Sequence, residues 1–202
     1  MSDIENDADE AEDKKSPLSR KDFKQALSKF SRADLIKLVG DLYSTSSDNR
    51  NFLEAKFSST TASPSSSSSS APSLKRYKAI IHKNLFPDVM TGTAPLSFVP
   101  VRKAISDYKK ATGDNAGVLE LMVYAVECGN DFTLEYGDID ERFYDNLFSL
   151  FSKAVQLLKT MDAQTREMTL PRLIAVVEKA DGIGWGYHDG ISDALYGAFP
   201  PE

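Results

Sequence analysis

The chain has 202 residues, of which 41% are hydrophobic and 27% charged, and its net charge is −6. This composition is typical of a soluble globular protein with one ordinary domain and a real core. No apolar run approaches 18 residues, which argues against a membrane span, and the acidic N-terminus lacks the pattern of a secretory signal. The single Cys128 can form no internal disulfide. We therefore expect a cytoplasmic protein.

Composition divides the chain into four segments. Residues 1–18 are acidic and polar and are expected to form a disordered tail. Residues 19–57 carry apolar side chains at helical spacing, which predicts a small N-terminal unit of three short helices. Residues 58–73 are rich in serine and predict a flexible linker. Residues 74–202 are the main domain.

The sequence pattern of the main domain, residues 74–202, predicts about six helices. Its expected breaks fall at Pro87, Gly113, Gly137 and the glycines of 182–186. No segment alternates polar and apolar residues with the period of a strand, and none carries a hairpin signal. We therefore expect an all-α fold, either an antiparallel helical bundle or a short helical array.

Several residues are expected to mark helix ends. Ser19 and Ser31 are predicted to cap the first two helices, and Asp140 and Asp189 are predicted to cap helices in the main domain, because their side chains accept hydrogen bonds from free amides. Pro171 is expected to kink its helix or to mark the helix start.

Charge is distributed unevenly in the main domain. Residues 74–112 hold eight basic and two acidic residues, whereas residues 113–202 hold six basic and 16 acidic ones. Such segments either complement each other or contact an external anion, and we favour the interpretation that these charges face each other or water. Weak nucleic-acid binding through 74–112 is a third functional hypothesis, made unlikely by the pI near 5.1 and the lack of a known motif.

An acidic stretch follows Tyr136. Asp138, Asp140 and Glu141 place three carboxylates within four residues. Carboxylates at short spacing in a loop can hold a hard divalent cation, although the spacing of an EF-hand is absent. Capping of the next helix explains the same residues, and we favour capping.

The residues from 181 to 189 hold three glycines, the only tryptophan and one of two histidines. The pattern is neither the dinucleotide-binding fingerprint nor a phosphate-binding loop. One interpretation is a tight connection between helices, with Trp185 as a buried anchor. The other places His188 beside the carboxylates as an acid–base pair or a mixed metal site. We favour the structural interpretation.

If helices alternate in direction, the two unusual turns lie at the same end of the domain. We therefore define one candidate binding surface that joins them: Tyr136, Asp138, Asp140, Glu141, Trp185, Tyr187, His188 and Asp189.

Four stretches resemble a family of small, mostly bacterial proteins catalogued only as a domain of unknown function. They are residues 31–43 (SRADLIKLVGDLY), 102–108 (RKAISDY), 132–144 (FTLEYGDIDERFY) and 182–189 (GIGWGYHD). The resemblance implies an all-helical cytoplasmic protein and implies no activity or catalytic residues. The serine-rich linker and the acidic tail depart from the family pattern.

We expect a protein-interaction or adaptor module with an unknown protein partner, no membrane and no required cofactor. The alternative is a small enzyme or metal-binding protein that uses His188 with Asp138 and Asp140, where a divalent cation is the possible ligand.

Overall fold

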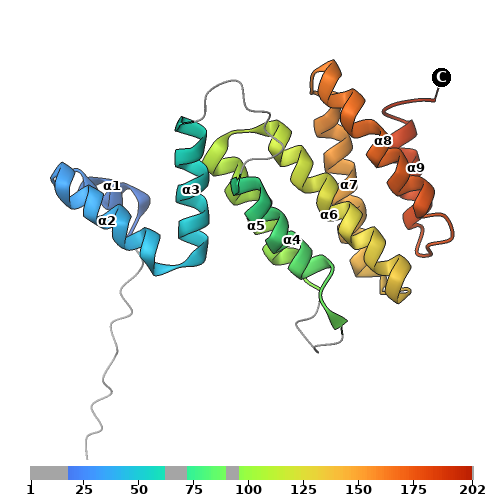
Figure 1. Ribbon diagram of the computed structural model, residues 1–202, viewed down its shortest axis with the longest axis horizontal. Coiled ribbons are helices and arrows are strands. Elements are labelled where there is room, and N and C mark those ends of the chain that lie inside the picture. Colours follow the sequence, from blue (N-terminus) through green and yellow to red (C-terminus); the bar gives the residue numbers. More distant parts are fainter. Residues whose placement is uncertain (1–17, 62–71, 90–95, 202) are drawn as a thin grey trace, which may run out of the picture. The chain divides into compact units, whose positions relative to one another are not determined.

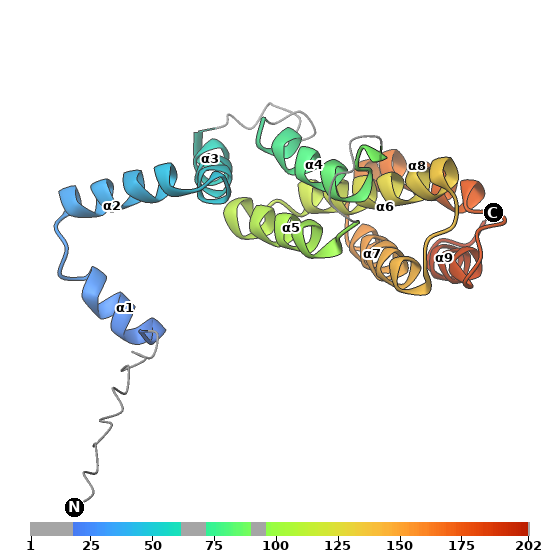
Figure 2. The ribbon, with the colours of Figure 1, turned by 90° about the horizontal axis from the view of Figure 1, so that it is seen from below.

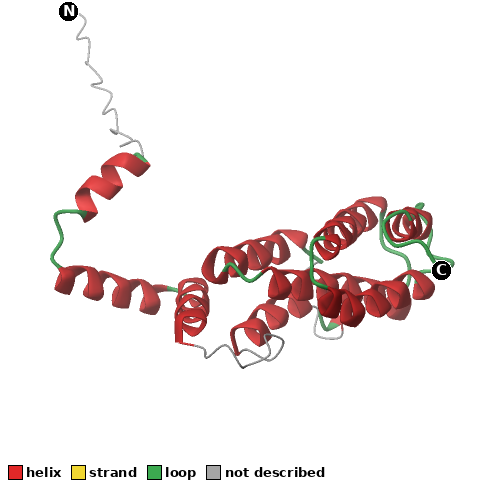
Figure 3. Cartoon of the chain, turned by 90° about the horizontal axis from the view of Figure 1, so that it is seen from above, coloured by secondary structure: helices red, strands yellow, loops and turns green. Residues whose placement is uncertain are grey.

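The computed structural model describes residues 18–61, 72–89 and 96–201 (Figure 1). Within these ranges the chain forms nine α-helices and no strand. Figure 3 accordingly shows helices and loops alone for these residues. The all-α prediction is confirmed. The helices are α1 (Arg20–Leu27), α2 (Arg32–Thr45), α3 (Ser47–Thr61), α4 (Pro72–Leu85), α5 (Phe98–Thr112), α6 (Asn115–Tyr136), α7 (Glu141–Lys159), α8 (Ala163–Lys179) and α9 (Tyr187–Tyr196). No helix in these ranges is both long enough and apolar enough to cross a membrane.

The chain divides into two compact units, Met1–Thr45 and Ser46–Glu202. In the first unit, α1 and α2 bury no residue. Their apolar side chains are exposed, as at Phe23 (51%) and Ile36 (59%). Two short helices without a buried side chain lack the core that holds an isolated small domain together.

Both predicted caps in the first unit are confirmed. Ser19 Oγ accepts a hydrogen bond from the Asp22 amide at 3.2 Å, and Ser31 Oγ accepts one from the Asp34 amide at 3.2 Å. Asp34 returns the interaction, because its carboxylate accepts a hydrogen bond from the Ser31 amide at 3.2 Å. Each pair satisfies amides that a helix start leaves free.

The third helix belongs to the second unit. α3 packs against α4 and α5, and Ala55 is fully buried in the common core. The prediction from sequence had placed this helix in the N-terminal unit, together with α1 and α2. The expected linker, 58–73, also overlaps helices at both ends, since α3 runs to Thr61 and α4 starts at Pro72. Residues 62–71, like most of the expected tail, lie outside the described ranges.

Helices α4 to α9 form a two-layered array (Figure 2). One layer holds α4, α6 and α8; α6 contacts both of its neighbours. The other layer holds α5, α7 and α9, with α7 against α9. Consecutive helices pair across the layers, as α4 does with α5, α6 with α7 and α8 with α9. Stacked helix pairs of this kind place alternate turns at the same end.

The core runs between the layers and consists mostly of leucine, valine, isoleucine and aromatic side chains. α6 is apolar around most of its surface, which is typical of a central helix. It approaches α7 closely at Gly129, where a Cβ atom would lie 2.6 Å from Leu147 Cδ1. The largest fully buried side chains include Tyr144, Phe151 and Tyr187.

Two predicted helix boundaries differ from the structure. Pro171 lies inside α8, whose start is capped by Asp162 through a 2.8 Å hydrogen bond from the Thr165 amide. Pro171 therefore does not mark a helix start. Asp189 does not cap α9 either, because the N-cap is Gly186, whose φ is 66°. Asp189 instead lies in the first turn of α9, where the helix dipole stabilises an acidic side chain.

Candidate functional site

The turn between α6 and α7 places Asp138 and Asp140 in different roles. Gly137 ends α6 at a φ of 93°, a backbone conformation that favours glycine. Asp140 caps α7, as predicted, since its Oδ1 accepts a hydrogen bond from the Phe143 amide at 2.7 Å. Glu141 lies in the first turn of α7, where the helix dipole favours its charge. The Oδ1 atom of Asp140 is therefore used in capping α7.

The turn between α8 and α9 has an unusual backbone at Trp185. Its φ is 61°, and it is the one non-glycine residue with a positive φ in the described ranges. Gly182 and Gly186 flank it with φ values of 82° and 66°. The side chain of Trp185 is 56% exposed, so the expectation of a buried anchor was wrong. A bulky residue in this conformation carries a backbone cost of about 1 kcal/mol or more.

The two turns meet at one end of the second unit. Trp185 Nε1 donates a hydrogen bond to Asp138 Oδ2 at 2.8 Å. The prediction that both turns lie at the same end is therefore confirmed. The end of α4 reaches the same region, because the rings of Phe86 and Tyr136 lie 6.0 Å apart.

Tyr144 of α7 anchors this turn from the inside. It is 2% exposed, and its hydroxyl donates a hydrogen bond to Asp138 Oδ1 at 2.5 Å. The same hydroxyl lies 2.5 Å from Thr133 Oγ1 and accepts a long hydrogen bond, 3.4 Å, from the Ile139 amide. Both carboxylate oxygens of Asp138 are thus hydrogen-bonded. The sequence analysis missed Tyr144, which has only its place on the apolar face of α7 as a signal.

The surroundings of this turn shift two pKa values in opposite directions. The Tyr144 hydroxyl, followed by the Trp185 indole, lowers the pKa of Asp138 below its usual value. Burial, followed by the hydrogen bond to Asp138, raises the pKa of Tyr144. Asp138 is therefore ionised and Tyr144 neutral at physiological pH.

The remaining residues of the candidate surface do not converge on these carboxylates. Tyr187 is 2% exposed and lies behind the surface, with its ring 5.4 Å from that of Tyr144. His188 Nδ1 lies 3.6 Å from Asp189 Oδ1, on its own helix. The described residues contain no group of three histidine, cysteine or acidic side chains suited to a metal.

Much of the basic charge in 74–112 is paired within the second unit. Lys78 bonds Glu120 at 2.6 Å, and Lys103 contacts both Asp48 and Asp107 at 2.8 Å. Of these pairs only Lys78–Glu120 joins residues 74–112 to residues 113–202, as the charge pattern predicted; Lys103 pairs with residues outside 113–202.

No local pattern in the sequence indicated an ion network centred on Arg172. This α8 residue donates two hydrogen bonds to the Glu127 carboxylate, at 2.8 and 2.7 Å, and one to Glu120 at 2.5 Å. Glu120 also accepts the bond from Lys78, so the network joins α4, α6 and α8. Arg172 lies 45 and 52 residues from its partners in sequence, a separation that no local pattern reveals.

No protein-family model, curated protein or solved structure matches this chain.

Proposed function

We propose that this protein is an interaction module that binds a partner protein at the end where the α6–α7 and α8–α9 turns meet. Trp185 is the anchor of this contact. Tyr136, which is 43% exposed, extends the surface on the side of α4. The resemblance to an all-helical family remains a proposal beside this one and adds no activity to it.

The observation that carries the proposal is the state of Trp185. Its indole is more than half exposed, yet its backbone is held in a costly conformation and its Nε1 atom is fixed by Asp138. Burial does not explain a tryptophan that exposes this much apolar surface. Tryptophan is enriched among the residues that dominate binding energy, and a side chain fixed in advance loses less entropy on binding.

The geometry gives less support to the enzyme or metal alternative. Both carboxylate oxygens of Asp138 accept hydrogen bonds, one from Tyr144 and one from Trp185, and Asp140 caps α7. His188 contacts Asp189 and neither of these aspartates. The same atoms that would serve chemistry are used to hold the turn, which is what a binding scaffold requires.

Site-specific photo-cross-linking tests the proposal. A benzoylphenylalanine at Gly184 is well placed, because a Cβ atom there would meet nothing within 4 Å. In an extract of the source organism we expect the labelled protein to form discrete adducts with other proteins. These adducts should disappear when the labelled protein also carries the substitution Trp185→Ala. Met168, which is 65% exposed on α8, is the matched control position. Adducts that survive Trp185→Ala, or that form equally from position 168, contradict the proposal.

A further inference from the structure

Two open cavities adjoin on the layer formed by α4, α6 and α8. One, of about 930 Å³, is lined by α4, the residues just after it and α6. The other, of about 880 Å³, is lined by α4, α6 and α8. Both include His82, Phe86 and Tyr124 in their walls. Together they form one groove across the layer, the three-helix groove.

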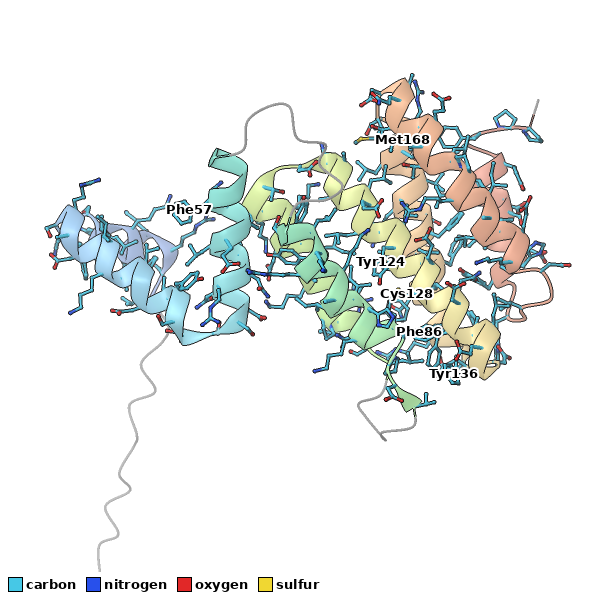
Figure 4. The ribbon with its side chains drawn as sticks, viewed as in Figure 1. Phe57, Phe86, Tyr124, Cys128, Tyr136 and Met168 are labelled. Atoms are coloured by element: carbon cyan, nitrogen blue, oxygen red, sulfur yellow. The ribbon has the colours of Figure 1, made fainter. Side chains whose placement is uncertain are left out.

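Aromatic rings provide the apolar part of this groove. Phe86 comes just after α4, and Tyr124 and Tyr136 come from α6 (Figure 4). The ring of Phe86 packs edge-on against that of Tyr136. Such rings supply a large contact area with few rotatable bonds, which favours binding of apolar side chains.

Unpaired positive charge lies along the α4 side of the groove. Lys75 and Lys83 are exposed, and neither has an acidic partner among the described residues. They are eight residues apart on one helix, so their Cα atoms are separated by about 12 Å along its axis. Lys78, between them, is already paired with Glu120, and Asp88 is the acidic residue in this half.

The α6–α8 half of the groove is nearly balanced in charge, because Glu127 pairs with Arg172 and Asp131 with Lys179. Glu127, Asp131 and Glu135 line it, together with Arg172 and Lys179. A nucleic-acid strand carries a negative charge at every nucleotide, and neither Arg172 nor Lys179 is free to pair with its phosphates in this half. A peptide can place its acidic residues over the α4 half alone, which makes a peptide the better fit.

The wall of this half also contains an unused hydrogen-bond acceptor. Asn130 is 1% exposed, and its Nδ2 atom makes a long bond, 3.4 Å, to the Val176 carbonyl. Its Oδ1 atom has no partner in the described part of the chain. A buried polar atom without a partner is costly, but Oδ1 is itself shielded from solvent, so a bound peptide amide would reach it only after a rotation of the Asn130 side chain.

We infer that the three-helix groove binds an acidic peptide segment of a partner protein. Carboxylates of the segment pair with Lys75 and Lys83, and apolar side chains between them pack on the rings of Phe86, Tyr124 and Tyr136. This contact goes beyond the one proposed at Trp185 and uses other side chains, with Tyr136 at the border of the two.

A peptide selection tests this inference on the full chain. A phage library of random 16-residue peptides is selected on the wild type, and enriched peptides are measured by fluorescence polarisation. We expect enriched peptides that are acidic and contain apolar residues. Combining Lys75→Glu with Lys83→Glu should weaken their binding at least about tenfold, because two attractions become repulsions. Lys109→Glu, in the last turn of α5, is the control and should change binding less than about twofold.

Three results overturn the inference. The first is the absence of enriched peptides, and the second is equal binding by the double variant. The third is a labelled single-stranded DNA that binds in a Lys75- and Lys83-dependent manner while no peptide does, which makes the groove a polyanion site. Circular dichroism melts of all variants exclude unfolding as the cause. Cross-linking at position 184 is independent of both lysines, so failure here leaves the proposal at Trp185 intact.

Discussion

The indole Nε1 of Trp185 lies 2.8 Å from Oδ2 of Asp138, across 47 residues of sequence. This hydrogen bond joins the turns inside two neighbouring helix pairs, α6–α7 and α8–α9. On its inner side, Asp138 is held by the buried hydroxyl of Tyr144. An exposed tryptophan is thereby connected to the core through a single carboxylate.

Replacing Tyr144 with phenylalanine should destabilise the second unit by about 1–2 kcal/mol. The variant removes a buried hydroxyl that bonds Asp138 and leaves Thr133 without that partner. Urea unfolding measures the change. Tyr187→Phe is the matched control, because the buried hydroxyl of Tyr187 has no partner among the described residues. Its removal should be neutral or stabilising; equal losses for the two variants would show that the hydrogen bonds are unimportant.

Replacing Arg172 with methionine should cost about 1–3 kcal/mol at neutral pH. The change leaves Glu127 and Glu120, both partly buried, without their guanidinium partner. Arg172→Lys should recover only part of the loss, since an ammonium group cannot bond one carboxylate in a bidentate manner. Full recovery by lysine would mean that charge alone matters at this position.

The same network predicts a pH dependence. Burial alone would raise the pKa of Glu120, but hydrogen bonds from Arg172 and Lys78 outweigh burial and lower it. A lowered folded-state pKa stabilises the protein above the unfolded value of about 4.3, and this stability is lost as pH falls through the folded value. The free-energy gap between wild type and Arg172→Met should therefore narrow below about pH 4. A gap that is constant from pH 7 to pH 3 contradicts this account.

Cys128 should react slowly with thiol reagents in the folded protein. Burial raises the pKa of its thiol to about 11, from a usual value of 9.0. At pH 8 this shift alone lowers the thiolate fraction by roughly 100-fold. The rate of alkylation by iodoacetamide, measured by mass spectrometry, should be at least about 100-fold lower in buffer than in guanidinium at about 6 M, which unfolds most domains. Comparable rates would place the thiol in solvent.

Introducing alanine at Gly129 should destabilise the contact between α6 and α7. The new methyl group would lie 2.6 Å from Leu147 Cδ1, and Leu147 is fully buried. Overpacking of this kind costs about 1–3 kcal/mol, which exceeds the helix-propensity gain of alanine. Gly184→Ala is the control in open space. A thermal midpoint for Gly129→Ala equal to that of wild type contradicts the close approach.

The sequence predicted what depends on local chemistry. Ser19, Ser31 and Asp140 cap the helices expected of them, because a cap is a bond between residues three apart. The meeting of the two turns followed from the alternation of helix directions. Trp185 was misjudged, because a glycine-rich turn does not reveal which way its one large side chain points.

Long-range relationships were beyond the sequence pattern. The sequence analysis did not single out Arg172, because its role depends on two glutamates of α6. The three-helix groove is formed by side chains from three separate helices. Likewise, α3 packs on α4 and α5 although a serine-rich segment separates it from them in sequence. Only the packed array brings these groups together.

Time-resolved fluorescence anisotropy of Trp185 tests the central claim most directly, because it is the only tryptophan. The account predicts that the wild-type indole tumbles with the folded unit. It should gain fast local motion in Asp138→Ala and gain less in Tyr144→Phe, which retains the partner of Nε1 but removes the inner anchor of Asp138. Fast local motion already in the wild type, or no change in Asp138→Ala, would contradict a tryptophan held in place by Asp138.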